Sequence, residues 1–316
     1  MFERLRTPTP FQIGSVNCYL AGRTLVDPGV ASDDAWSTLT DALANRGIEP
    51  SEIDRVLITH PHPDHFGMAK WFKEVGASIW AASEAVDIIE DFPGRLEFEQ
   101  SYFRSFLVDH GLARDVAETA VQLPEAYLEF APSCPIDRAL DDGDRFEVAG
   151  TEVVSERLTG HASGECMYSW QDGEGEHAIV GDHVLQQITP NPFLQPPSEP
   201  GEPRPRVLPA YNRSLERLAM RDFTSLLPGH GDVVDRPTHR IDRLLEFHER
   251  RTEKVAHGLD QPMNAAAVMR DLFGDLPVTE IYGGMSEAIG HLDVLELRGR
   301  VERSKREGVW YYELVE

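Results

Sequence analysis

Apolar and polar residues alternate in short segments of the first part of the chain, and this alternation predicts β-strands. Four such segments come early in the sequence: 11–22, 24–30, 54–60 and 77–83. Residues 31–47 and 66–76 instead repeat apolar residues at helical spacing, and each of these segments ends on a glycine. Strands that alternate with helices in this way indicate a layered α/β domain.

The segment from about residue 84 to 130 has a different pattern, because helical repeats follow one another with no clear strand. We interpret it as a helical insertion, either a lid or simple packing. Strand patterns return at 144–159, 165–171 and 177–182. A proline-rich segment then covers about 189–209, and loops of this length are uncommon in compact domains and often functional.

A helix (211–222) and a strand with its turn (224–234) follow the proline-rich loop. After Pro237 the pattern changes to three helices and a hairpin, which we expect at 239–258, 264–274, 286–299 and 301–316. This order predicts a winged-helix appendage. We therefore expect two domains, a large α/β domain at 1–238, which contains the insertion and the proline-rich loop, and a small winged-helix-like domain at 239–316.

The charge of the chain is strongly negative, with 54 acidic against 30 basic residues and a net charge of −24. Such a surface repels nucleic acid and anionic membranes at ordinary ionic strength. Two explanations compete: adaptation to a high-salt cytosol, where charges are screened over about 3 Å at 1 M salt, and a GC-rich genome that favours Arg over Lys. We favour the first as a hypothesis.

The sequence contains no apolar run of membrane-spanning length, and its amino terminus lacks the apolar stretch of a signal peptide. We therefore expect a cytoplasmic protein with no membrane partner. The three cysteines, Cys18, Cys134 and Cys166, are widely spaced and odd in number, so they predict no disulfide framework. We expect them to be small buried residues.

The strongest chemical signal is the segment THPHPDH, in which four metal-ligand side chains fall within six residues. They are His60, His62, Asp64 and His65, directly after a predicted buried strand. Imidazole and carboxylate are natural ligands of Zn²⁺. The prolines between them lack N–H groups and stiffen the loop, which lowers the entropy cost of fixing the ligands. The segment therefore predicts a metal site.

This segment resembles the His-x-His-x-Asp-His signature of the metallo-β-lactamase superfamily. The other markers of the family follow in order: LTGHASGE resembles the next motif and gives His161, IVGDHVL gives Asp182, and LPGHG gives His230. The resemblance covers about residues 11–236. It implies an α/β fold, a four-layer αββα sandwich, with the site along one edge of its two sheets.

The resemblance also implies the roles of these residues. His60, His62 and His161 would bind one metal, Asp64, His65 and His230 a second, and Asp182 would bridge both. We expect two divalent ions, with Zn²⁺ favoured over Mn or Fe. Water bridging two metals roughly 3.5–4 Å apart has its pKa lowered toward about 7 and can attack a carbonyl or phosphorus centre. Asp64 would be the catalytic residue that orients this nucleophile and shuttles its proton.

The bridging aspartate makes the chain similar to glyoxalase II-like hydrolases rather than to antibiotic-degrading members. We therefore predict hydrolysis of a small-molecule ester or thioester. His183, next to Asp182, is a candidate for a supporting role. The six remaining histidines, together with Tyr168 and Tyr211, are interpreted as structural or surface residues.

The C-terminal pattern resembles that of lactamase-B-like hydrolases with a winged helix, which include an endoribonuclease. Five basic residues make the wing locally basic: Arg298, Arg300, Arg303, Lys305 and Arg306. Residues 240–316 nevertheless contain 11 basic and 15 acidic side chains, 11 − 15 = −4. The alternatives that stay open are a nuclease that contacts nucleic acid through this domain, an iron-dependent sulfur dioxygenase, and a non-catalytic metal-binding protein. A solvated wing that covers the site or forms a homodimer is favoured over nucleic-acid binding.

Overall fold

The structure, a computed structural model, describes residues 1–199 and 201–315, without the side chains of residues 123–125. Pro200 of the predicted proline-rich loop and Glu316 of the predicted hairpin lie outside the described residues. The chain divides into two compact units. The first consists of Met1–Arg95, Ala126–Pro190 and Leu218–Arg240, and the second of Leu96–Glu125, Asn191–Arg217 and Ile241–Glu316.

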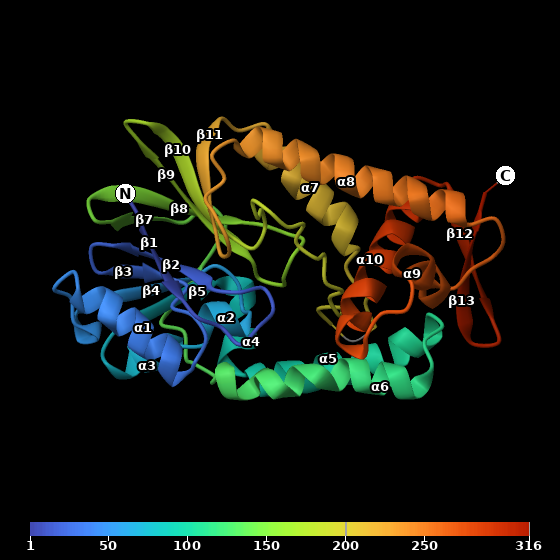
Figure 1. The fold of residues 1–316 in the computed structure, drawn as a ribbon, viewed down its shortest axis with the longest axis horizontal. Coiled ribbons are helices and arrows are strands. Elements are labelled where there is room, and N and C mark those ends of the chain that lie inside the picture. The colour runs from blue at the N-terminus through green and yellow to red at the C-terminus, as the bar shows by residue number, and fades with distance from the viewer. Residues whose placement is uncertain (200, 316) are drawn as a thin grey trace. The chain divides into compact units, whose positions relative to one another are not determined.

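The first unit contains two mixed β-sheets (Figure 1). One sheet has the order β1(Glu3–Thr7), β2(Val16–Ala21), β3(Thr24–Val26), β4(Arg55–Ile58), β5(Ser78–Ala82) and β6(Arg138–Leu140). Its first three strands are antiparallel, and β3 to β6 are parallel. The parallel strands reach the same edge with their carboxyl ends, which is where loops that carry chemistry are placed in such sheets.

The second sheet has the order β11(Phe223–Pro228), β10(Gly175–Gly181), β9(Cys166–Asp172), β8(Thr151–Arg157) and β7(Arg145–Val148). Only β10 and β11 are parallel. The carboxyl ends of β10 and β11 therefore lie side by side.

The two sheets face one another across a common apolar core. One continuous cluster of buried side chains includes Leu25 and Ile58 of the first sheet and Val153, Tyr168 and Ile179 of the second. This packing confirms the α/β class and the two central layers of the predicted sandwich. Because side chains of both sheets are buried in this core, the packing also holds the ends of the strands in place.

Short helices connect the strands of this unit: α1(Asp33–Ala44), α2(Pro63–Phe66), α3(Ala69–Glu74), α4(Val86–Glu90) and the 3₁₀ helices η1(Pro50–Glu52) and η2(Ser83–Ala85). Helix α1 lies within the predicted helical segment 31–47, and the Ser32 side chain caps it by accepting a hydrogen bond from the backbone N–H of Ala35. Its Trp36 packs edge-on against Trp71 of α3. Figure 1 shows α1 and α3 together on one face of the first sheet.

The second unit is mainly helical. It contains most of α5(Phe92–Asp109), α6(Arg114–Gln122), α7(Val207–Ala219), α8(Pro237–Gly258), α9(Ala265–Phe273) and α10(Val278–Leu297), and the hairpin β12(Val301–Arg306) and β13(Val309–Leu314). A separate buried cluster joins Phe103 and Leu107 of α5 to Met285 and Ile289 of α10. The three C-terminal helices and the hairpin are present in the predicted order.

The structure differs from the sequence prediction in several places. Strand β1 and strand β6 were not predicted. The proline-rich segment ends earlier, because α7 begins at Val207, and Pro209 is tolerated in the first turn, where its missing N–H has no partner to lose. The predicted insertion is helical, with η3(Leu123–Phe130) at its end. Residues 96–125 belong to the second unit and pack there, so the boundary between the units is not the single one expected at 238/239.

Candidate metal centre

The segment that carries the first four candidate ligands connects strand β4 to helix α2 in the first unit. The strand ends at Ile58, and the helix begins at Pro63, so His62 occupies the N-cap position. Proline is well suited to the first helical position because its N–H would have no helical partner. His60 therefore lies in the connection, whereas Asp64 and His65 lie on the first turn of the helix.

The other three candidates come from ends of the second sheet. His161 lies in the loop between β8 and β9, Asp182 directly follows β10, and His230 comes two residues after β11. Two tyrosine hydroxyls fasten these strand ends to the opposite sheet. Tyr168 donates to the carbonyl of Ile58 at 2.7 Å, and Tyr19 donates to the carbonyl of Pro228 at 2.7 Å.

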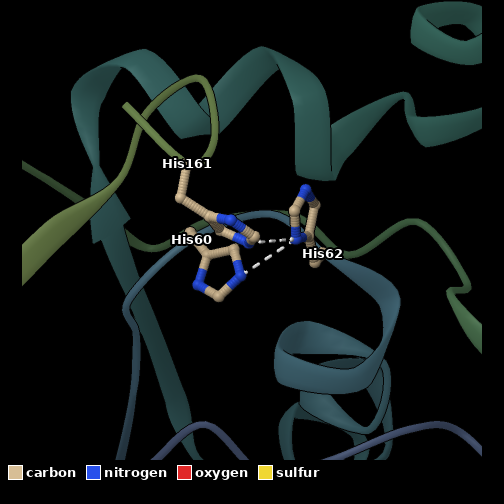
Figure 2. A group of neighbouring side chains, drawn as sticks. All are labelled: His60, His62 and His161. Atoms are coloured by element: carbon tan, nitrogen blue, oxygen red, sulfur yellow. Dashed lines mark hydrogen bonds between the residues drawn. The ribbon is translucent and has the colours of Figure 1, made fainter. Parts of the chain in front are cut away.

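One group consists of His60, His62 and His161 (Figure 2). Nδ1 of His62 lies 3.1 Å from Nε2 of His60 and 3.2 Å from Nε2 of His161. Two nitrogens bound to one tetrahedral zinc at about 2.0–2.1 Å lie about 3.3 Å apart. A ring nitrogen carries at most one hydrogen, so it cannot donate to both neighbours, whereas a shared metal accounts for all three nitrogens.

A second group consists of Asp64, His65 and His230, whose ligand atoms also converge. Oδ2 of Asp64 lies 3.1 Å from Nε2 of His230 and 4.0 Å from Nε2 of His65. All three residues are buried. The sequence therefore identified two sets of three side chains that the fold brings together.

Asp182 lies between the two groups. Its Oδ1 is 3.6 Å from Nε2 of His65, and its Oδ2 is 3.8 Å from Nε2 of His161 and 3.5 Å from Nε2 of His230. One carboxylate thus reaches side chains of both groups. This is the arrangement that a bridging ligand requires.

The rings of the second group are oriented by residues that the sequence reading did not select. Asp27 accepts hydrogen bonds from the backbone N–H and the hydroxyl of Thr59, at 2.8 and 2.6 Å. It also lies 2.9 Å from Nδ1 of His65. A carboxylate only accepts, so Nδ1 of His65 carries the hydrogen and Nε2 presents its lone pair to the site.

The same logic applies to two other histidines. The hydroxyl hydrogen of Thr59 is used on Asp27, so Nδ1 of His60, 3.0 Å away, donates to the Thr59 oxygen. Nδ1 of His230 donates to the carbonyl of Ser15 at 2.9 Å. In its neutral form each ring therefore has its lone pair on Nε2, which is the tautomer that a metal ligand needs.

Burial and charge shape the protonation of the cluster. Burial lowers the pKa of His62 to about 3, and the neighbouring His161 contributes to this. Burial would also lower the pKa of His65, but the carboxylates of Asp182 and Asp64 outweigh it and raise that pKa well above its ordinary value. In Asp182, burial would raise the pKa, but His230 and His65 lower it. The carboxylate is therefore charged at neutral pH.

The cluster fits divalent metal ions. Nε2 of His65, Nε2 of His230 and Oδ1 of Asp182 are buried without a hydrogen-bond partner among the described residues. Such atoms are costly to bury unless something binds them. Neutral imidazole and carboxylate are ligands for zinc and for other first-row metals. The donor set, its tautomers and these atoms therefore fit bound metal.

Two glycines allow the backbone to approach the cluster closely. A Cβ on Gly229 would lie 2.4 Å from Oδ1 of Asp182 and 2.5 Å from Cε1 of His65. Gly181 has a positive φ of 50°, and a Cβ there would lie 2.6 Å from Oγ1 of Thr59. Only glycine fits these positions without displacing the candidate ligands.

Asp27 is the main residue that the sequence analysis missed, because it lies within the predicted strand segment 24–30 and was given no role in the site. A signal was nevertheless present: it follows strand β3, which is parallel to β4 and next to it. The carboxyl ends of neighbouring parallel strands meet at one edge, so Asp27 had to lie near His60 and His65.

Two of the remaining histidines, His110 and His177, have structural contacts within their own units. His110 donates to the carbonyl of Phe106, His177 contacts Ser225, and burial lowers the pKa of His110 to about 4. Tyr211 is fully buried, as is Tyr168. Both therefore belong to the core, which was the favoured interpretation.

The three cysteines are buried and form no disulfide, as expected. Burial raises the pKa of Cys18 and of Cys166 to about 12 and that of Cys134 to about 11. These thiols are therefore poor nucleophiles at neutral pH. Among the described residues, no helix is long and apolar enough to cross a membrane.

Comparisons with known proteins agree with this geometry. The sequence model of the metallo-beta-lactamase superfamily matches residues 12–230. A Bacillus subtilis relative named "Probable metallo-hydrolase YqjP" is 30% identical over 297 residues, which cover 92% of this chain and 91% of the relative.

Two crystal structures are similar over almost the whole chain. A metallo-beta-lactamase family protein from Thermus thermophilus has a TM-score of 0.82 and 26% identity, covering 99% of this chain and 98% of the other. A beta-lactamase domain protein from Burkholderia ambifaria has a TM-score of 0.81 and 26% identity, covering 99% and 91%. The similarity therefore includes the C-terminal helices and hairpin.

Proposed function

The chain belongs to the metallo-beta-lactamase superfamily and is a metal-dependent hydrolase, and from this premise we propose that it uses two metal ions to hydrolyse an ester or thioester of a small molecule. His60, His62 and His161 would hold one ion, and Asp64, His65 and His230 the other. We propose zinc for both positions.

The observation that carries the proposal is the position of Asp182. Its two oxygens lie within 3.8 Å of ring nitrogens in both groups, at His65, His161 and His230. A site for a single metal needs no charged carboxylate between two sets of ligands. The bridging position supports a dinuclear centre of the glyoxalase II-like kind.

Metal ions bound here would lower the pKa of water and polarise the carbonyl oxygen of the ester or thioester. The chain itself supplies position and proton handling. In Asp64, burial would raise the pKa, but His65 and His230 lower it, so the side chain is a charged acceptor at neutral pH. We propose that Asp64 accepts a hydrogen bond from the attacking water, which orients the water. Asp64 would then take up the water's proton during the attack and give it to the leaving group.

The electrostatics of the C-terminal hairpin support a small substrate over nucleic acid. All five basic residues that made this wing a candidate for phosphate binding form ion pairs with acidic side chains of the same unit. The pairs are Arg298 with Glu249, Arg300 with Glu253, Arg303 with Glu296, Lys305 with Asp109, and Arg306 with Glu313. Phosphate binding would have to compete with these carboxylates. A winged-helix fold and a cytoplasmic location stay predictions.

A substrate panel tests the proposal. Thioesters, esters, lactones and RNA should be compared in low salt and in molar KCl, with metal content measured on the same samples. We expect turnover of a thioester or ester, about two zinc ions per chain, and loss of both metal and turnover in Asp182→Ala. Iron as the native metal would favour the sulfur dioxygenase. Full activity in Asp182→Ala would refute the assignment.

A further inference from the structure

A buried carboxylate without an assigned role lies directly behind the candidate centre. Glu165 is 3% exposed and is not among the candidate ligands. Burying a carboxylate is costly unless its oxygens are hydrogen bonded. Both oxygens of Glu165 are bonded, and both partners lie in segments that carry candidate ligands.

The first oxygen holds the loop of His161. Oε1 of Glu165 accepts a hydrogen bond from the backbone N–H of His161 at 2.9 Å. The same loop is closed at its base, where the backbone N–H of Leu158 donates to the carbonyl of Glu165 at 3.0 Å. The backbone N–H of Cys166 donates to the carbonyl of Thr59 at 2.8 Å, which fastens the loop to the segment of His60.

The second oxygen holds the segment of Asp182. Oε2 of Glu165 lies 3.2 Å from Nδ1 of His183, the residue after Asp182, and accepts its hydrogen. His183 is fully buried, and its backbone N–H donates to the carbonyl of Val180 at 3.1 Å. The turn that carries Asp182 is therefore held by backbone and ring together.

We propose that Glu165 is a positioning residue that couples His161 to Asp182 through His183. Its carboxylate sets the place of the loop with one oxygen and the place of the turn with the other. His161 and Asp182 thereby keep the 3.8 Å contact between Nε2 and Oδ2 that a shared metal needs. The inference rests on the proposed metal centre but not on the identity of the substrate.

Metal affinity measured on the folded chain tests this coupling. Four variants should be compared with the unaltered chain: Glu165→Ala, Glu165→Gln, His183→Ala and the double alanine variant. Zinc affinity would be measured by competition with a chromophoric chelator, and the Tm of each metal-free protein separately. We expect either single alanine change to lower zinc affinity about 10–100-fold. The double variant should bind zinc no less tightly than the single variant with the lower affinity, because both changes break the same hydrogen bond between Glu165 and His183.

Glu156→Gln is the matched control. Glu156 lies on the strand that leads into the same loop, but it bonds to Ser169 and Arg221 rather than to candidate ligands. We expect it to keep zinc affinity even if its Tm falls. Glu165→Gln keeps an acceptor for the His161 N–H, so its affinity should lie between those of the unaltered chain and Glu165→Ala.

Wild-type affinity in Glu165→Ala, or losses that multiply in the double variant, would overturn the inference. If Glu165→Ala does not fold, Glu165→Gln and His183→Ala test the inference instead. Unchanged zinc affinity in both of these variants would also overturn it. A chain that binds two zinc ions and shows the coupling but hydrolyses no ester or thioester is another outcome. That result would refute the proposed substrate and still support the coupling through Glu165 and His183. A chain that binds no zinc refutes both.

Discussion

Exchanging Asp27 for asparagine should weaken metal binding without removing any ligand. The side chain keeps its size, and its oxygen can still accept from the backbone N–H of Thr59. The amide nitrogen that replaces Oδ2 cannot accept from Nδ1 of His65. It would instead donate to Nδ1, which moves the ring hydrogen to Nε2, the atom that faces the metal position.

The magnitude follows from the contacts that change. Asp27 accepts three hydrogen bonds, and Asp27→Asn disrupts the two made by Oδ2, to the Thr59 hydroxyl and to His65. A buried hydrogen bond contributes about 0.5–1.5 kcal/mol and up to about 3 kcal/mol when one partner is charged. We expect a loss of about 2–4 kcal/mol in the free energy of unfolding. Changes behind a metal ligand typically cost about 10–100-fold in metal affinity.

Chelator competition and denaturant unfolding of the metal-free protein would measure the two effects separately. Asp137→Asn is a suitable control, because Asp137 accepts from the backbone N–H of Ile79 and from Lys73 without touching a candidate ligand. It should lose stability and keep zinc affinity. Unchanged zinc affinity in Asp27→Asn would falsify the tautomer argument, whatever happens to stability.

Two further predictions follow from the packing and the charge of the centre. Gly229→Ala places a Cβ 2.4 Å from Oδ1 of Asp182, so we expect zinc content and activity to fall together; retained zinc on metal analysis would contradict the close approach. The second concerns pH: burial would lower the pKa of His65 and of His230, but Asp182 raises both above 6.5. The stability that these protonated rings give the metal-free protein is present below pH 6.5 and is lost as pH rises through the raised values. Zinc must displace the same protons, so the increase in Tm on adding zinc should grow between about pH 6 and about pH 8, and a constant increase would count against it.

The sequence was sufficient for those parts of the fold that local pattern determines. Helix α1 was predicted from the helical spacing of its apolar residues, and the structure has it at Asp33–Ala44. Strand β1 was missed because its five residues, Glu-Arg-Leu-Arg-Thr, contain only one large apolar side chain and so show no strand pattern. Its pairing with β2, not its own pattern, makes it a strand.

The division into units could not be predicted from local pattern either. Residues 96–125 lie between two segments of the first unit in the sequence, so the simplest reading places them in the same domain. Phe103 and Leu107 instead bury their side chains with α10, which lies far along the chain near its C-terminal hairpin. Such long-range packing leaves no periodic signal that identifies its partner.

For the candidate site, the motifs named the candidate ligands but, apart from His183, not the residues that orient them. A ligand motif can be recognised because its spacing follows from one strand and one turn, as for His60 to His65. The orienting contacts join distant segments: Asp27 to His65, Ser15 to His230, and Glu165 to His161 and His183. These pairings depend on which strand ends meet at the edge of the two sheets, which only the fold determines.

The acidity of the chain and the chemistry of its centre act over different distances. The net charge of −24 produces a field that repels polyanions from afar, and salt screens it over a Debye length of about 10 Å at 0.1 M. Within the centre, two divalent ions would bring four positive charges to a cluster that contains the carboxylates of Asp64 and Asp182, with those of Asp27 and Glu165 behind its histidines. Positive charge at the metal positions favours an oxygen that gains negative charge during the reaction. A small ester that carries little charge meets the favourable centre without the long-range repulsion, whereas RNA meets the repulsion first. The two fields together therefore select for the substrate class proposed here, and salt should relax the exclusion of RNA more than it affects ester turnover.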